Sequence, residues 1–209
     1  MATTPIARSK SAALARILDC VPKGYHRYTC GVVAASKAVS LGKKFHLLYG
    51  IGCTPAQRLT KKKKGHANTL LVVYWPVDIE VVEWILLSTD GEGMEKEDLR
   101  HAEDKPRLHF LGYELVRRSS RGKTTWTWRR PKQEMEKLHT LLAYQARTQN
   151  YSALTASLER IARQPGFHGV LSQSAELFHA ARRNGYTEAP PKLFYMQKTK
   201  HGERISVAP

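Results

Sequence analysis

Two apolar segments constrain the fold of this chain more than any other feature. Residues 68–76 (NTLLVVYWP) and 81–89 (VVEWILLST) are rich in β-branched and aromatic side chains. Pro76 ends the first segment and Asp90-Gly91 follows the second, and both are typical turn signals. We therefore predict two adjacent, mostly buried strands at the centre of a sheet.

The segments that precede this sheet centre alternate between helical and strand patterns. Residues 9–18 favour a helix and residues 25–33 favour a strand. Apolar residues recur at helical spacing over 34–50, and Gly50 stands where a C-terminal cap would end that helix. The basic stretch that follows Gly50, QRLTKKKKGH at 57–66, is predicted to be a loop after this helix.

The second part of the chain contains a hairpin pattern and then three amphipathic helices. Residues 107–118 and 123–130 are separated by SSRG, in which Gly122 can adopt a positive φ. Helices are predicted over 132–147, 151–163 and 169–185, and a terminal hairpin between 192–198 and 203–207.

These elements predict an α+β fold. A mainly antiparallel N-terminal sheet with one early helix is followed by a helical half that packs on it. We expect one domain over residues 1–209, with a mainly sheet half at 1–131 and a mainly helical half at 132–209.

Net charge limits the class of partner. The chain has 34 Lys and Arg residues against 18 Asp and Glu residues, a net charge of +16, which favours a polyanion and above all nucleic acid. Residues 78–104 hold ten acids and two bases, a net charge of −8, so the rest of the chain carries +24. Such segregation predicts a bipolar molecule whose acidic segment either faces away from the polyanion or binds a divalent metal.

Two basic clusters are the candidate nucleic-acid contacts. A lysine run of this kind is also common on solvated loops that bind nothing, and that alternative stays open. The first cluster is Arg58, Lys61, Lys62, Lys63 and Lys64; the second is Arg117, Arg118, Arg121, Lys123, Trp126, Trp128, Arg129 and Arg130.

The tryptophans of the hairpin allow two interpretations. Strand alternation places Trp126, Trp128 and Arg130 on one face. If this face is exposed, the indoles form a stacking platform for unpaired bases. If it is buried, they anchor the helical half.

Two other functions compete with simple nucleic-acid binding. Asp90 and Glu92 follow a buried strand, where a nuclease would hold Mg²⁺, and His109 is a candidate general acid or base. The same acids also fit a turn followed by a helix N-terminus. A basic adaptor or inhibitor that binds an acidic protein is the third hypothesis. Outside the nuclease alternative we expect no metal and no cofactor.

The lack of a membrane-span pattern and of a signal-peptide pattern predicts the cellular compartment. No apolar run has the length of a membrane span, and the N-terminus has no signal-peptide pattern. The spacing of Cys20, Cys30 and Cys53 fits neither a disulfide framework nor a zinc site. We therefore expect a cytoplasmic, bacterial protein without a membrane partner.

Overall fold

The chain is divided into two compact units. The computed structural model describes residues 2–120, 122–195 and 202–207. Met1–Leu111 and Thr199–Pro209 form the first unit, and Gly112–Lys198 form the second, which is thus inserted into the first. The predicted hairpin belongs to the second unit from Gly112 onward, and its residues 107–111 belong to the first. That the chain unfolds as one domain stays a prediction.

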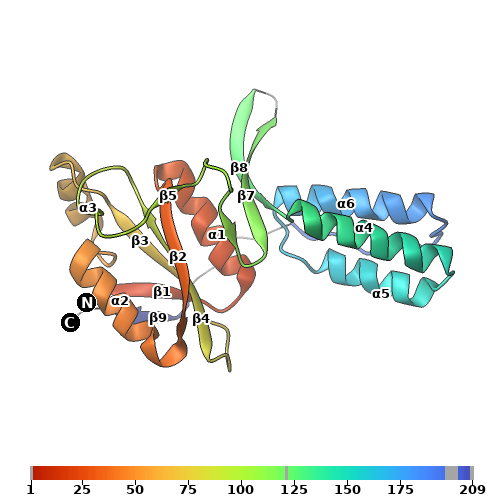
Figure 1. Ribbon diagram of the computed structural model, residues 1–209, viewed down its shortest axis with the longest axis horizontal. Helices are drawn as coiled ribbons and strands as arrows, with labels where there is room; N and C mark the ends of the chain where they lie inside the picture. The colour runs from red at the N-terminus through yellow and green to blue at the C-terminus, as the bar shows by residue number, and fades with distance from the viewer. Residues whose placement is uncertain (1, 121, 196–201, 208–209) are drawn as a thin grey trace. The chain divides into compact units, whose positions relative to one another are not determined.

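The first unit is built on a six-stranded, mostly antiparallel sheet in the order β5-β2-β4-β3-β1-β9 (Figure 1). The strands β1 and β3 are parallel, whereas β4 is antiparallel to both β2 and β3. The elements are β1 Thr3–Ala7, α1 Lys10–Cys20, β2 Arg27–Ala34, α2 Ala38–Tyr49, α3 Pro55–Lys63, β3 Thr69–Tyr74, β4 Val81–Ser88, β5 Arg100–His101, β6 His109–Phe110 and β9 Arg204–Ser206, with short 3-10 turns at Val21–Lys23 and Ala35–Lys37.

The predicted sheet centre is confirmed, and both of its faces are buried. On one face, Leu71 and Leu86 pack with Phe45 and Tyr49 of α2. The helix α1 contacts β1 and β3 and contributes no residue to that cluster, so it covers the other face. Fully burying a side chain of this kind contributes about 1.5–3 kcal/mol. The buried residues of the face opposite α2 are Leu70, Val72, Ile85 and Leu87.

Helix ends follow signals that are present in the sequence. The Ser9 hydroxyl accepts a hydrogen bond from the Ala12 amide and caps α1. Gly50 adopts φ 70° and ends α2, as its position predicts.

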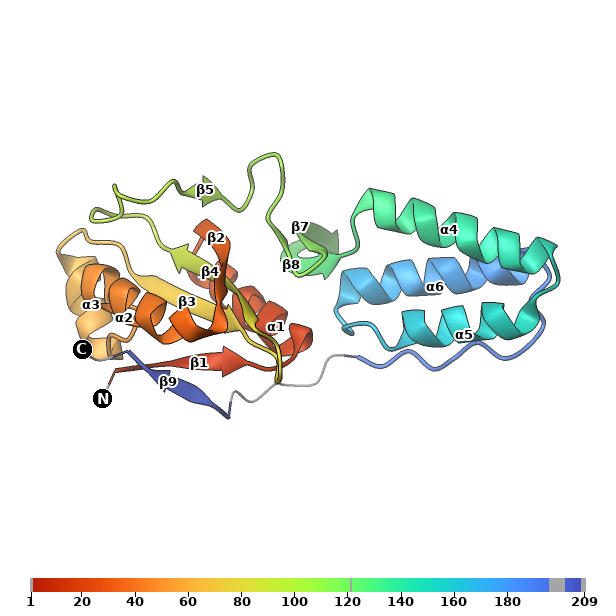
Figure 2. The same ribbon diagram turned by 60° about the horizontal axis from the view of Figure 1, so that its bottom comes forward.

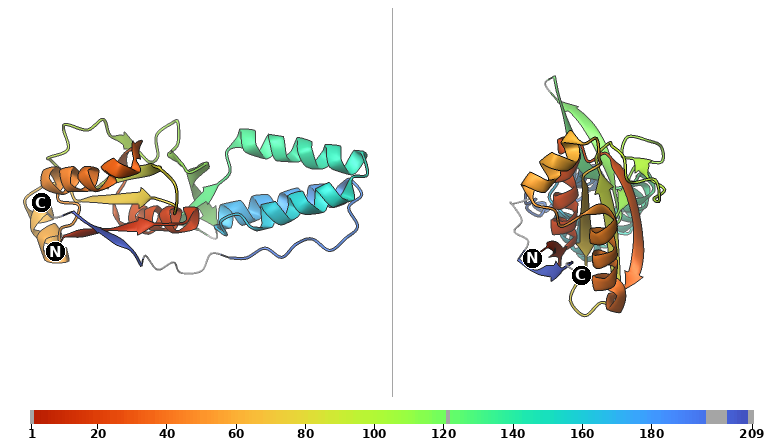
Figure 3. Two further views of the ribbon diagram at one scale, coloured as in Figure 1. Left: turned by 90° about the horizontal axis from the view of Figure 1, so that it is seen from below. Right: turned by 90° about the vertical axis from the view of Figure 1, so that its left-hand side faces the viewer.

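The strand β9 belongs to the first unit, although it follows the whole second unit in the sequence. It pairs with β1, beside which it lies in Figure 3, rather than with residues 192–195. Residues 196–198 of the predicted hairpin lie outside the described residues. Val207, just after β9, is fully buried in the core cluster of α2. An ion pair between Arg8 and Glu203 joins the same two chain ends.

The second unit combines a hairpin with three helices, which lie side by side in Figure 2. Its elements are β7 Tyr113–Ser120, β8 Lys123–Arg129, α4 Lys132–Arg147, α5 Tyr151–Ala162 and α6 His168–Arg183. The three predicted helices are confirmed, and Met135, Leu142, Leu154, Leu158 and Ile161 all belong to one buried cluster. Among the described residues, no helix combines the length and apolarity that crossing a membrane requires.

Candidate nucleic-acid interface

The first basic cluster lies on a helix, so the predicted loop is wrong. Thr54 caps α3 by accepting a hydrogen bond from the Gln57 amide, while the Gln57 side chain accepts one from the Thr54 amide. Pro55 occupies the first turn, where its missing amide hydrogen costs nothing. Lysines in the last turn meet the negative end of the helix dipole, which stabilises the helix further.

The five cations of this cluster do not share one environment. Lys61 points inward and its ammonium group donates to the Tyr49 carbonyl at 2.8 Å. Burial lowers the pKa of Lys61. The guanidinium of Arg58 is half-buried and donates to the Ile51 carbonyl at 3.4 Å. The cations of the cluster that are fully exposed are Lys62, Lys63 and Lys64.

Part of the acidic segment lies directly beside the C-terminal end of α3. The Glu92 amide donates to the Gly65 carbonyl, and the Ala67 amide donates to the Glu92 carbonyl, both at 3.0 Å. Glu95 is close enough to His66 for the two charges to interact. Glu92 and Glu95 therefore lie close to residues 65–67, which directly follow α3.

Of the two carboxylates proposed for a nuclease, that of Asp90 has a structural partner. Asp90 accepts a hydrogen bond from Arg27 at 2.8 Å, although both side chains are exposed. His109 is exposed in β6. Across the parts of the chain that the structure describes, no group of three or more His, Cys, Asp or Glu side chains could hold a metal ion.

A buried tyrosine links the acidic segment to α2. The Tyr49 hydroxyl donates to the Glu97 carboxylate at 2.7 Å. Burial, followed by this hydrogen bond, raises the pKa of Tyr49 to about 12. The protonated hydroxyl is thus favoured in the folded state.

This contact predicts a loss of stability at alkaline pH. The unfolded tyrosine titrates near pH 10, so the contribution is complete below about pH 10 and is lost as pH rises toward 12. One pKa unit corresponds to about 1.4 kcal/mol, and we expect a loss of about 2 kcal/mol. Urea unfolding of the wild type and of Tyr49→Phe at pH 8–11.5 measures it. Lys61 is present in both proteins, so its titration cancels in the difference; parallel pH profiles would contradict the expectation.

The second basic cluster lies on the β7–β8 hairpin, whose root is buried. In the strand register Leu115 faces Trp128, and both are fully buried. The Thr127 hydroxyl accepts a hydrogen bond from the Gly169 amide at 3.0 Å at the start of α6. For Trp128, therefore, the interpretation as a core anchor holds and the stacking interpretation does not.

The arginines at the end of β8 differ sharply. Arg130 is only 3% exposed and donates to the Val170 carbonyl at 3.1 Å and to the Ser174 hydroxyl at 2.9 Å. Burial lowers the pKa of its guanidinium. Arg129 is half-buried, and its contact with the Glu114 carboxylate is long, at 3.5 Å. In this structure the buried Arg130 side chain is hydrogen-bonded to residues of α6.

The outer half of the hairpin forms a basic ribbon. We define the ribbon as residues 117–120 and 123–126, whose strands rise clear of the three helices of their own unit in Figure 1. The guanidinium of Arg117 lies 5.3 Å from the centroid of the Trp126 ring. Arg118 is half-buried opposite Thr125. Arg121 and the side chain of Lys123 lie outside the described residues.

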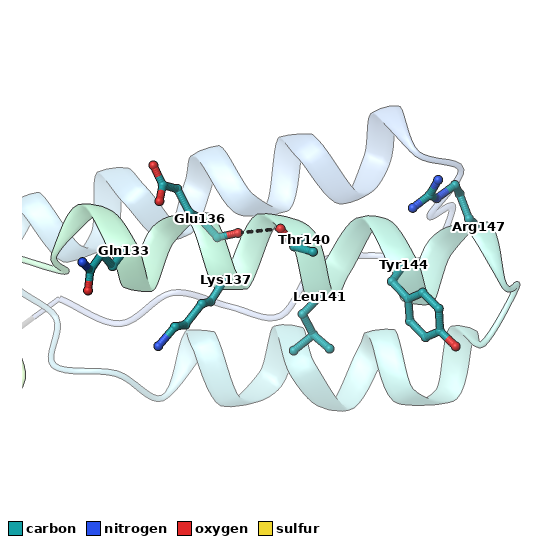
Figure 4. Close-up of a pocket in the computed structure, with 7 residues that line it drawn as sticks. All are labelled: Gln133, Glu136, Lys137, Thr140, Leu141, Tyr144 and Arg147. Atoms are coloured by element: carbon teal, nitrogen blue, oxygen red, sulfur yellow. Dashed lines mark hydrogen bonds between the residues drawn. The ribbon is translucent and has the colours of Figure 1, made fainter.

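A groove along α4 was not predicted from the sequence. It encloses about 650 Å³, and Tyr144, which is 60% exposed, stands near one end of it. Lys137, Leu141 and Tyr144 point to the same side of the helix (Figure 4). Their spacing of four and three residues was the available signal. The lining residues are Gln133, Glu136, Lys137, Thr140, Leu141, Tyr144 and Arg147.

The two predicted clusters belong to different units, since α3 lies in the first and the hairpin in the second. A single surface formed by both stays a prediction. Sequence reasoning also overlooked the exposed hydroxyl residues of the ribbon, Ser119, Thr124 and Thr125.

Comparison of the chain with known protein families, with curated proteins and with solved structures gives no match.

Proposed function

We propose that the protein binds nucleic acid and that the ribbon makes the principal contact. The observation that supports this most is that the charged side chains in this part of the hairpin are all positive. The sequence from Leu115 to Trp128 contains four cations and no acid. A phosphate backbone offers such a segment regularly spaced negative charge, and its neutralisation releases counterions.

The wider charge of the second unit supports the same function. It carries fifteen Lys and Arg residues against six Asp and Glu residues, a net charge of +9. This excess attracts a polyanion during the approach, whereas the ribbon supplies the local contacts. The exposed lysines of α3 are the proposed secondary contact, because the unit that carries them also holds the acidic segment.

We propose the bacterial cytoplasm as the compartment. Cys20, Cys30 and Cys53 are free, and Cys30 is exposed. Exposed thiols persist in a reducing compartment, and nucleic acid is abundant there.

The first test removes the two described cations of the ribbon. We expect Arg117→Gln combined with Arg118→Gln to weaken binding of a labelled oligonucleotide by roughly tenfold or more, because each charge-assisted contact is worth about 1.5–3 kcal/mol. Fluorescence anisotropy at fixed ionic strength, with duplex DNA, single-stranded DNA and RNA, measures the change.

A matched control is available in the same unit. Arg182 and Arg183 are exposed at the C-terminal end of α6. That end is about 24 Å along the helix from the end that contacts the hairpin. Arg182→Gln with Arg183→Gln removes the same charge and should change affinity less than threefold. Equal losses in both double variants would mean that the ribbon has no special role.

The lysines of α3 have a smaller expected effect. Changing Lys62, Lys63 and Lys64 to glutamine removes three charges, but these lysines belong to the unit that also holds residues 78–104, with their net charge of −8. We expect this triple variant to lose less affinity than the ribbon double variant in the same anisotropy assay. A larger loss would move the principal contact to α3.

A further inference from the structure

The ribbon has features that select a class of nucleic acid, and this inference rests on the function proposed above. We infer that the ligand is B-form duplex DNA and that the ribbon enters its major groove. Three features of the ribbon bear on this choice: the covered face of its indole, its dimensions and its polar side chains.

A stacking platform for unpaired bases is disfavoured at Trp126. The guanidinium of Arg117 lies over the ring at 5.3 Å, so one face of the indole is already covered. The tryptophan is also half-buried. Base stacking needs an accessible aromatic face. Trp126 instead positions Arg117, and it is therefore a positioning residue.

The dimensions of the ribbon suit one groove. Four residue pairs join the two strands of the ribbon, from Arg117 with Trp126 to Ser120 with Lys123. Two antiparallel strands lie about 4.8 Å apart, and a ribbon of this kind fits the major groove of B-form DNA, which is about 12 Å wide. The major groove of duplex RNA is too narrow for such readout.

The polar side chains of the ribbon suit the same site. Arg117 and Arg118 lie on opposite faces, because they are neighbours on one strand. In the groove, one arginine can reach guanine acceptors while the other contacts phosphate. Ser119, Thr124 and Thr125 are exposed and add short hydrogen-bonding groups, which fit both bases and phosphates.

Competition experiments with the full chain test the ligand class. Unlabelled duplex DNA, single-stranded DNA and duplex RNA of one length compete against a labelled DNA duplex. We expect duplex DNA to compete at least about tenfold better than the other two. Equal or better competition by single-stranded DNA would overturn the inference, above all if Trp126→Leu removed that preference. Absence of binding to any nucleic acid would instead overturn the proposed function itself.

A second measurement tests the groove. Duplexes with glucosylated 5-hydroxymethylcytosine carry a bulky group in the major groove and retain all phosphates. We expect them to bind at least about tenfold more weakly than unmodified duplexes, whereas a minor-groove-binding polyamide should leave affinity unchanged within about twofold. Unchanged affinity for the modified duplex would show that the ribbon lies on the phosphates only. That result would contradict groove entry and leave the proposed function intact.

Discussion

Replacing Trp128 by alanine is expected to destabilise the second unit by about 3–5 kcal/mol. The indole is fully buried and faces Leu115, which is also fully buried. Its backbone lies against α6, where a Cβ on Gly169 would stand 2.5 Å from the Trp128 carbonyl oxygen. Alanine at position 128 would therefore leave a cavity at a fully buried site.

Trp126, two residues earlier on the same face, provides the control. It is half-buried, and its contacts include the cation–π pair with Arg117, which is worth about 0.5–1 kcal/mol at exposed positions. Trp126→Ala should therefore cost about 1 kcal/mol. Urea unfolding followed by far-UV circular dichroism compares the two variants. Similar midpoints for both would contradict the assignment of Trp128 as the anchor of the hairpin.

The second large effect is expected at Arg130. Methionine has a similar length but cannot donate to the Val170 carbonyl or the Ser174 hydroxyl. Buried acceptors that lose a charged donor cost about 1.5–3 kcal/mol each. Ser174 also donates to Val170, which limits the total, so we expect a loss of about 2–4 kcal/mol from Arg130→Met.

Arg129 is the matched control for this change, because it precedes Arg130 and is half-buried. Its contact with Glu114 is long, at 3.5 Å, so Arg129→Met should change the free energy of unfolding by less than about 1 kcal/mol. Denaturant unfolding of both variants separates the two roles. If Arg130→Met were as stable as the wild type, the guanidinium would not be holding α6 in place.

The elements that sequence could predict are those specified by short-range patterns. The sheet centre follows from runs of β-branched residues, and the end of α2 follows from Gly50. Helix α3 was also predictable in principle, since Thr54 and Gln57 form a capping box and Pro55 stands in the first turn, next to the lysine run.

Other features depend on contacts between distant residues. The strand β9 pairs with β1 at the opposite end of the sequence, and no local pattern encodes that choice of partner. Alternation places Trp126 and Trp128 on one face, yet Trp128 is fully buried and Trp126 only half-buried. Arg130 is buried because its guanidinium bonds to α6, which is distant in sequence. Likewise, the position of Glu92 beside residues 65–67 results from backbone hydrogen bonds that charge counting cannot show.

The salt dependence of binding tests the proposed nucleic-acid contact most directly. Binding of a labelled DNA duplex is measured by anisotropy from 50 to 300 mM salt for the wild type and for the variant carrying Arg117→Gln and Arg118→Gln. We expect the logarithm of the association constant to fall linearly with the logarithm of salt concentration. The slope should be shallower by about 2 in the variant, at about 0.9 for each phosphate that the variant no longer neutralises. A variant with the wild-type slope, or a wild type that binds no nucleic acid at 50 mM salt, would contradict the assignment of the ribbon as a phosphate-binding surface.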